Sequence, residues 1–135
     1  MAPPMLPVVL AVLANGMLGA AWYNEATLSP AWRRAHGLTP ASAAALNGGT
    51  SIALSVLGAL FQTLAADYVL GLVGAATPLD QLAALAYLWF GLTFMTMASH
   101  LTFVTPKWAT AALIDGVYHL VQLALFVAIR NLVVL

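Results

Sequence analysis

The feature that most constrains the fold is a long apolar stretch that lies between Lys107 and Arg130. About 22 residues separate these two charges, which is roughly 33 Å of helix at about 1.5 Å per residue and matches the hydrocarbon core of a bilayer. The stretch therefore predicts a membrane-spanning helix. Asp115, His119 and Gln122 share one face of it, at i, i+4 and i+7. Because a carboxylate inside a span costs about 2.5–3.5 kcal/mol, we expect Asp115 to face protein or water rather than lipid.

The composition of the whole chain agrees with a membrane protein. Of 135 residues, 63% are hydrophobic and only 6% are charged, whereas soluble domains carry about 25% charged residues. This length fits one transmembrane domain over residues 1–135 with about four spans. Because the chain is so apolar, we expect the lipid bilayer as a partner. The formal net charge is zero, so we expect no nucleic acid as a partner. Cysteine is absent, which excludes disulfides and thiolate chemistry.

Three threonine-proline pairs predict where helices begin, because the hydroxyl can cap a helix and proline needs no hydrogen-bond acceptor there. They are Thr39-Pro40, Thr77-Pro78 and Thr105-Pro106. The sequence predicts an all-α, integral membrane protein, a bundle of four transmembrane helices near residues 5–24, 48–73, 79–104 and 107–133.

The first loop is predicted to carry a short interfacial helix near residues 30–36, since Pro30 suits a helix start and Gly37 a helix end. After it, a continuous helix from Pro40 to Val73 would be about 50 Å long, too long for one crossing. We expect an interruption at Asn47-Gly48-Gly49, where two glycines lower the helix propensity.

The basic residues predict the orientation in the membrane. Arg33, Arg34 and Lys107 lie in the first and third loops, against Arg130 and the N-terminal amine on the opposite side. Positive charge favours the cytoplasmic side, so both termini are predicted to be non-cytoplasmic.

Several short motifs resemble a bacterial membrane family, domain of unknown function 1761. The motifs are Gly19, Trp22-Tyr23, Trp32, Gly37-Leu38-Thr39, Leu88-Trp89-Phe90-Gly91, Pro106-Lys107-Trp108 and Ile114-Asp115-Gly116-Val117-Tyr118. The resemblance implies a four-helix protein of the bacterial cytoplasmic (inner) membrane, and it implies no established activity. It also implies that relatives carry asparagine more often than aspartate at the position of Asp115.

Polar residues predicted at similar depth form the candidate site. If helices pair as a hairpin about Pro106, His100 and Asp115 differ in depth by about three residues, roughly 5 Å. Asn15 and Asn47 fall in the same half of the bilayer, and His119 can hydrogen-bond Asp115 at i, i+4. The binding or proton-relay candidates are Asp115, His119, Gln122, His100, Asn15 and Asn47.

A metal or haem site is an alternative interpretation of His100, Asp115 and His119, which are suitable ligand types. His100 and His119 differ in depth by about 9 Å, which is poor geometry for two axial haem ligands. We therefore expect no cofactor. No catalytic triad and no phosphate-binding glycine loop occurs in the sequence, so it does not indicate an enzyme.

Two functions follow from this pattern. In the first, the polar cluster binds or transports a proton, an ion or a small molecule between the helices. In the second, the protein is a non-catalytic accessory or assembly subunit of a membrane complex, and its polar stripe only holds helices together. Gly16 with Ala20 and Ala112 with Gly116 have the spacing of close helix contacts, which favours a homodimer or larger assembly.

Overall fold

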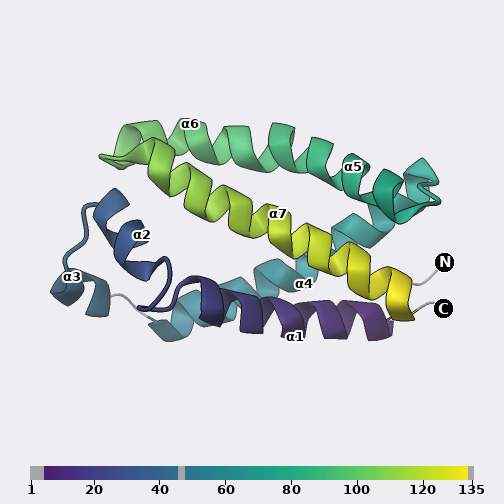
Figure 1. Cartoon of the computed structure of the whole chain (residues 1–135), viewed down its shortest axis with the longest axis horizontal. Coiled ribbons are helices and arrows are strands. Elements are labelled where there is room, and N and C mark those ends of the chain that lie inside the picture. The colour runs from purple at the N-terminus through teal and green to yellow at the C-terminus, as the bar shows by residue number, and fades with distance from the viewer. Residues whose placement is uncertain (1–4, 46–47, 134–135) are drawn as a thin grey trace.

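The computed structural model describes residues 5–45 and 48–133. These residues form helices joined by short turns, which confirms the all-α prediction and the short helix in the first loop (Figure 1). The elements in chain order are α1 (Met5–Trp22), α2 (Ser29–Ala35), α3 (Pro40–Ala44), α4 (Gly48–Val73), α5 (Pro78–Leu88), the π-helix η1 (Trp89–Phe94), α6 (Met95–Val104) and α7 (Trp108–Val133).

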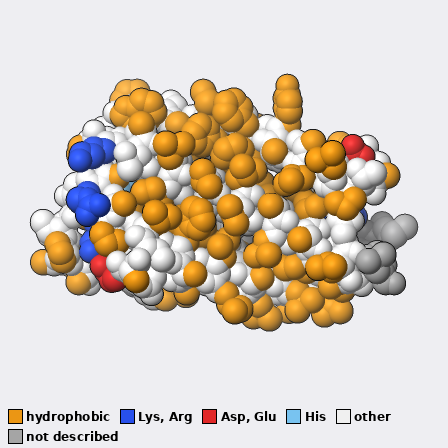
Figure 2. All heavy atoms as spheres, viewed as in Figure 1, with side chains coloured by type: hydrophobic (Ala, Val, Ile, Leu, Met, Phe, Trp, Pro, Cys, Tyr) orange, Lys and Arg blue, Asp and Glu red, His pale blue; other side chains and the backbone are white. Residues whose placement is uncertain are grey.

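Four helical segments are long and apolar enough to cross a membrane, and they confirm the four-helix membrane bundle. They are Met5–Trp22, Gly48–Val73, Pro78–Val104 and Trp108–Val133, the third being α5, η1 and α6 in continuous succession. Hydrophobic side chains cover the middle of the molecule, and the charged ones visible lie near its two ends (Figure 2). The extent of the domain and the orientation of the termini stay predictions.

Helix α7 lies at the centre of the bundle. It contacts α1, α2, α4, α5, η1 and α6, and in Figure 1 it crosses between α1 and the α5–α6 segment. Its buried face carries small residues near the start, Ala111, Ala112 and Gly116, and larger ones such as Phe126 further along. Small residues let neighbouring backbones approach closely, so α7 can pack on several helices at once.

The small-residue pairs have different surroundings. A Cβ on Gly116 would lie 2.5 Å from Cδ2 of Phe94, so this glycine is required by close packing within the chain. A Cβ on Gly19 would lie 2.9 Å from the Tyr118 hydroxyl oxygen. A Cβ on Gly16 would meet nothing within 4 Å, and Gly16 is exposed. Assembly with a second copy therefore stays a prediction.

Two of the three predicted helix starts have the expected cap. Thr39 and Thr77 each accept a hydrogen bond from the backbone N–H three residues on. Thr105 instead ends α6 in an extended conformation, and α7 begins only at Trp108. The cause is a tertiary contact, since the backbone N–H of Lys107 donates to the Ala35 carbonyl, which ties this turn to the end of α2.

The predicted interruption of the second long helix corresponds to the gap between α3 and α4. Helix α3 ends at Ala44, and α4 begins at Gly48. Asn47 lies outside the described residues.

The third span contains a π-helical segment that the sequence did not predict. Residues 89–94, WFGLTF, form η1 between two α-helical parts. Three of its aromatic rings pack on one another, with Trp89 to Phe94 centroids 5.2 Å apart and Phe90 to Phe94 centroids 5.8 Å apart. Such bulges are rare and occur often at functional sites.

Candidate functional site

Asp115 is the centre of a polar cluster at the α2 end of the bundle. The Tyr23 hydroxyl donates to its Oδ1 at 2.7 Å. The Trp32 indole N–H donates to its Oδ2 at 3.3 Å, and Nε2 of His36 lies 3.9 Å from the same oxygen. We call Tyr23, Trp32, His36 and Asp115 the Asp115 cluster. Its members come from three segments, so the carboxylate joins the first loop to α7.

The local structure of the first loop aims its side chains at Asp115. Trp32 on α2 and His36 at its C-terminal end lie four residues apart, and their rings pack at a tilt of 36° with centroids 4.4 Å apart. Nδ1 of His36 donates to the Trp32 carbonyl at 3.0 Å, which directs Nε2 toward the carboxylate. Burial, and then the hydrogen bond to Asp115, raise the pKa of Tyr23 well above its ordinary value. Tyr23 therefore stays protonated and acts as a donor.

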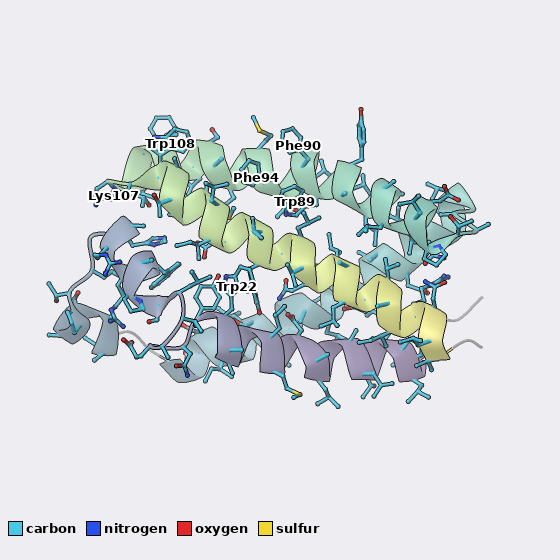
Figure 3. All side chains as sticks on the ribbon, viewed as in Figure 1. Trp22, Trp89, Phe90, Phe94, Lys107 and Trp108 are labelled. Atoms are coloured by element: carbon cyan, nitrogen blue, oxygen red, sulfur yellow. The ribbon has the colours of Figure 1, made fainter. Side chains whose placement is uncertain are left out.

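Two tryptophans hold the backbone of α7 on either side of Asp115. The indole N–H of Trp22 donates to the Ile114 carbonyl at 3.2 Å, and that of Trp89 donates to the Gly116 carbonyl at 3.0 Å. Figure 3 shows Trp22 reaching α7 from α1 and Trp89 reaching it from η1. Both indole groups satisfy their donors while fixing the depth of Asp115 in the bundle.

A second polar network lies deeper, between α1 and α7. Oδ1 of Asn15 accepts from the Tyr118 hydroxyl at 3.2 Å and from Nε2 of Gln122. Nδ1 of His119 donates to Oε1 of Gln122 at 2.8 Å. We call Asn15, Tyr118, His119 and Gln122 the Asn15 network. Asn15 is only 9% exposed, and its side-chain oxygen accepts hydrogen bonds from protein groups rather than from bulk water.

The Asp115 cluster and the Asn15 network contact each other through two tyrosine rings. The ring of Tyr118 lies edge-on to that of Tyr23, with centroids 5.3 Å apart. Tyr118 belongs to the Asn15 network and Tyr23 to the Asp115 cluster. The polar residues are therefore adjacent along α7 rather than scattered.

A small cavity adjoins the Asn15 network on its α4 side. Its volume of about 10 Å³ has room for about one water molecule. It is lined by Ala11, Asn15, Ala59, Gln62, Thr63, Gln122, Leu123 and Phe126.

The far end of the bundle carries an ion pair and an amide pair. Nε of Arg130 donates to Oδ1 of Asp67 at 2.9 Å, and both side chains are largely buried. Nδ2 of Asn131 donates to Oε1 of Gln81 at 2.8 Å, and Gln81 is 2% exposed. These pairs link α7 to α4 and to α5.

The structure separates some of the predicted site residues. The predicted hydrogen bond between Asp115 and His119 does not form, because Tyr23 and Trp32 occupy the carboxylate oxygens and His119 turns toward Gln122. Asn15 joins Gln122 and, through it, His119, but it does not bond to Asp115.

The remaining candidates do not join either group. His100 is exposed, and its side chain forms no hydrogen bond with another described residue. Asn47 lies outside the described residues. Within residues 5–45 and 48–133, no three histidine, aspartate or glutamate side chains gather closely enough to hold a metal ion, so His100, Asp115 and His119 do not form a ligand set.

The partners that sequence reasoning missed are Tyr23, Trp32 and His36. Tyr23 and Trp32 lie 92 and 83 positions from Asp115 in the sequence, so helical spacing could not link them to it. One signal was present, since an acid inside a span requires donors and the first loop holds the densest group of aromatic donors.

Comparison with known proteins identifies a family. The model of a family described as a protein of unknown function (DUF1761) matches residues 6–130. Searches of curated proteins and of solved structures each found no match.

Proposed function

Since the chain belongs to the DUF1761 family, whose description carries no activity, we propose from the site itself that this membrane protein passes protons through its helix bundle along α7. The observation that carries the proposal is the succession of polar groups along this helix. Asp115, Gln122 and Arg130 follow at intervals of seven and eight residues, about 10 and 12 Å along the axis. Each has a polar partner from another helix, Trp32 of α2, Asn15 of α1 and Asp67 of α4 respectively.

The chemistry of the first group suits proton entry. Asp115 and His36 are both titratable and both 19% exposed, so water at the loop end reaches them. The other titratable groups that face them are the Tyr23 hydroxyl, in direct contact, and the Tyr118 ring beyond it. A carboxylate, an imidazole and phenols are the groups that serve proton relays inside membrane proteins.

The middle of the bundle limits the size of the cargo. The cavity beside Asn15 and Gln122 holds about one water molecule, with a volume of about 10 Å³. Neither a hydrated ion nor an organic solute fits this space. Thr63 lines the cavity, and Asp67 lies one helical turn further along α4. A water in the cavity would connect the Asn15 network toward the Asp67–Arg130 pair.

A second function, a non-catalytic assembly subunit, is favoured by a different observation. Among the described residues, no buried side-chain nitrogen or oxygen lacks a hydrogen-bond partner. A fully satisfied network fixes helix packing without moving anything. In that case Asp115 would matter for stability alone.

Proton flux into liposomes separates the two functions. Purified protein would be reconstituted into vesicles that contain a pH-sensitive dye, and a potassium gradient with valinomycin would set an inside-negative potential. We expect faster acidification than in protein-free vesicles, and loss of the excess rate in Asp115→Asn and Asp67→Asn. Arg34→Gln is the matched control, because Arg34 is exposed on α2 and outside both polar groups.

Two results would contradict proton transport. Wild-type vesicles that acidify no faster than empty ones, with the protein shown to be folded and inserted, would favour the assembly function. Flux that persists in Asp115→Asn would show that protons do not pass through Asp115.

A further inference from the structure

A groove lies beside α2 and α3 and adjoins the Asp115 cluster. Its volume is about 430 Å³, within the range of roughly 300–1,000 Å³ that is common for small-molecule sites. It is lined by Glu25, Ser29, Trp32, Arg33, Pro40, Ala43 and Ala44. Trp32 is the one lining residue that also contacts Asp115.

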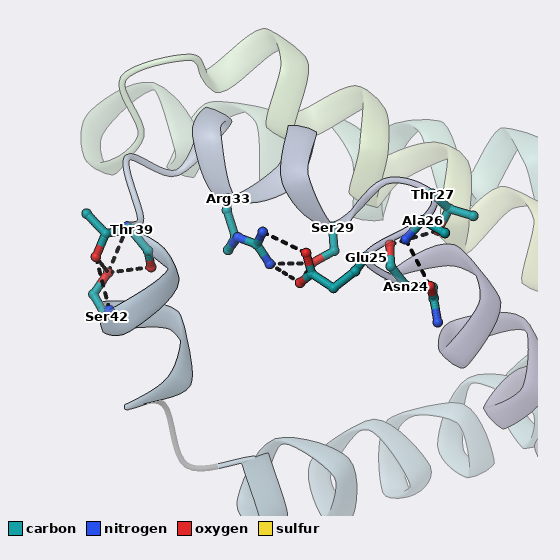
Figure 4. Close-up of polar contacts among 8 residues, drawn as sticks. All are labelled: Asn24, Glu25, Ala26, Thr27, Ser29, Arg33, Thr39 and Ser42. Atoms are coloured by element: carbon teal, nitrogen blue, oxygen red, sulfur yellow. Dashed lines mark hydrogen bonds and ion pairs between the residues drawn. The ribbon is translucent and has the colours of Figure 1, made fainter.

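The polar wall of the groove is a pair of opposite charges. Nη1 and Nη2 of Arg33 donate to the two carboxylate oxygens of Glu25. The Ser29 hydroxyl donates to the same carboxylate at 3.0 Å and accepts from Arg33 at 3.0 Å (Figure 4). The Arg33 side chain is 17% exposed and that of Glu25 is 69% exposed. Arg33 is therefore held in place, while Glu25 can turn outward at little cost.

We infer that this groove binds the headgroup of a phosphoethanolamine lipid. A phosphate fits the planar fork of Arg33, with two parallel N–H donors. When the phosphate displaces the carboxylate, Glu25 becomes free to accept the N–H groups of the lipid ammonium, and Ser29 can donate to a phosphate oxygen. The Arg33–Glu25 ion pair is thus replaced by two ion pairs, Arg33 with the phosphate and Glu25 with the ammonium, and the total charge of protein and lipid does not change.

The charge balance of the groove selects this headgroup. An anionic lipid without an amine would satisfy Arg33 but leave its own charge facing Glu25. A choline headgroup carries a positive charge but no N–H donor for the carboxylate. A phosphoethanolamine headgroup satisfies both residues.

The position of the groove favours a lipid over a soluble ligand. It adjoins the loop that follows the end of the first span at Trp22, where headgroups meet a bilayer. Exposed Arg34 and Lys107 lie in the loops at the same end of the bundle. The other wall of the groove is apolar, with Pro40, Ala43 and Ala44. Acyl chains attached to a headgroup there can continue along exposed apolar residues of α4 such as Ile52.

Native mass spectrometry of the detergent-solubilised full chain tests this site. The protein would be titrated separately with phosphatidylethanolamine, phosphatidylcholine and phosphatidylglycerol of the same acyl chains. We expect one phosphatidylethanolamine adduct with at least about tenfold tighter binding than either other lipid, since both of the others lack the charge-assisted hydrogen bond from an ammonium N–H group to Glu25. Equal binding of the three lipids would overturn the inference.

The variants assign the binding to the groove. Arg33→Gln should weaken phosphatidylethanolamine binding about tenfold or more, whereas Arg34→Gln, on the same helix, should leave it unchanged. Glu25→Gln should keep the phosphate contact and shift the preference toward phosphatidylglycerol. Because Glu25 is exposed, this variant tests the site even if Arg33→Gln fails to fold. Equal losses in the Arg33 and Arg34 variants would refute the site.

Competition with free phosphoethanolamine tests whether the ligand is a lipid or a soluble molecule. If the lipid is the ligand, millimolar amounts of the soluble headgroup should not displace it. Displacement at such concentrations would show that the groove takes a soluble zwitterion and that the acyl chains contribute nothing.

Discussion

Replacing Asp115 by asparagine should leave the stability of the fold nearly unchanged, whereas replacing it by leucine should destabilise the fold. Asparagine offers one acceptor and one donor where the carboxylate offers two acceptors. The indole N–H of Trp32 can only donate, so it requires the amide oxygen. The Tyr23 hydroxyl both donates and accepts, so it can rotate to accept from the amide nitrogen. Both contacts of Asp115 survive the change.

The magnitudes follow from this geometry. In Asp115→Asn, the hydrogen bonds from Tyr23 and Trp32 lose their charged partner, which lowers the free energy of unfolding by about 1 kcal/mol for each bond. Removing a charge from a membrane span raises the stability by a similar amount. Asp115→Asn should therefore be within about 1 kcal/mol of the wild type. Leucine leaves the Tyr23 and Trp32 donors unpaired, at about 1–3 kcal/mol each. Asp115→Leu should be at least about 2 kcal/mol less stable than Asp115→Asn.

Unfolding by sodium dodecyl sulfate in mixed micelles, followed by far-ultraviolet circular dichroism, measures these differences. Tyr23→Phe in the leucine background removes one unpaired donor and should restore part of the lost free energy. Equal stability of Asp115→Asn and Asp115→Leu would refute the reasoning, because it would mean that the two donors do not depend on Asp115.

Two further predictions concern packing and pH. Gly116→Ala should destabilise the protein by about 1–3 kcal/mol in the same unfolding assay, because the new Cβ would lie 2.5 Å from the Phe94 ring. Gly58→Ala, where nothing lies within 4 Å, should be neutral or stabilising by up to about 1 kcal/mol. The Arg33 guanidinium lowers the pKa of Glu25 below its ordinary 4.5, so this pair stabilises the first loop at any higher pH. Hydrogen exchange of the loop, corrected for intrinsic rates, should stay constant above pH 4.5 and increase only as the pH falls through that lowered pKa.

The parts of the fold that depend on local chemistry could be predicted from the sequence. Apolar length gave the four spans, and a threonine before a proline gave the helix starts at Pro40 and Pro78. The start of α7 could not be predicted in this way, because the backbone of Lys107 is held by the Ala35 carbonyl, a contact between distant segments. The π-helix was also unpredictable, since a uniformly apolar stretch carries no periodic signal of which turn is widened.

The candidate site was predicted in part. The helical period placed Asp115, His119 and Gln122 on one face of α7, but it could not decide which neighbour each side chain contacts. Asp115 bonds to the first loop and His119 to Gln122. Which contacts form depends on where the first loop, after α1, folds back onto α7. The spacing of residues along α7 does not contain this information.

The π-helix η1 has a consequence for how the gene can change. Each residue of an α-helix advances the side-chain direction by about 100°, and a π turn accommodates one more residue than an α turn. Deleting a single codon within residues 89–94 could therefore turn this segment into regular α-helix while leaving the orientation of α5 relative to α6 nearly unchanged. Gln81 and Leu85, now buried on α5, would keep their present neighbours. We expect random single-codon deletions within residues 89–94 to be tolerated far better than single-codon deletions in the middle of α4 or α7, where the loss of one residue rotates one half of the helix by about 100° relative to the other.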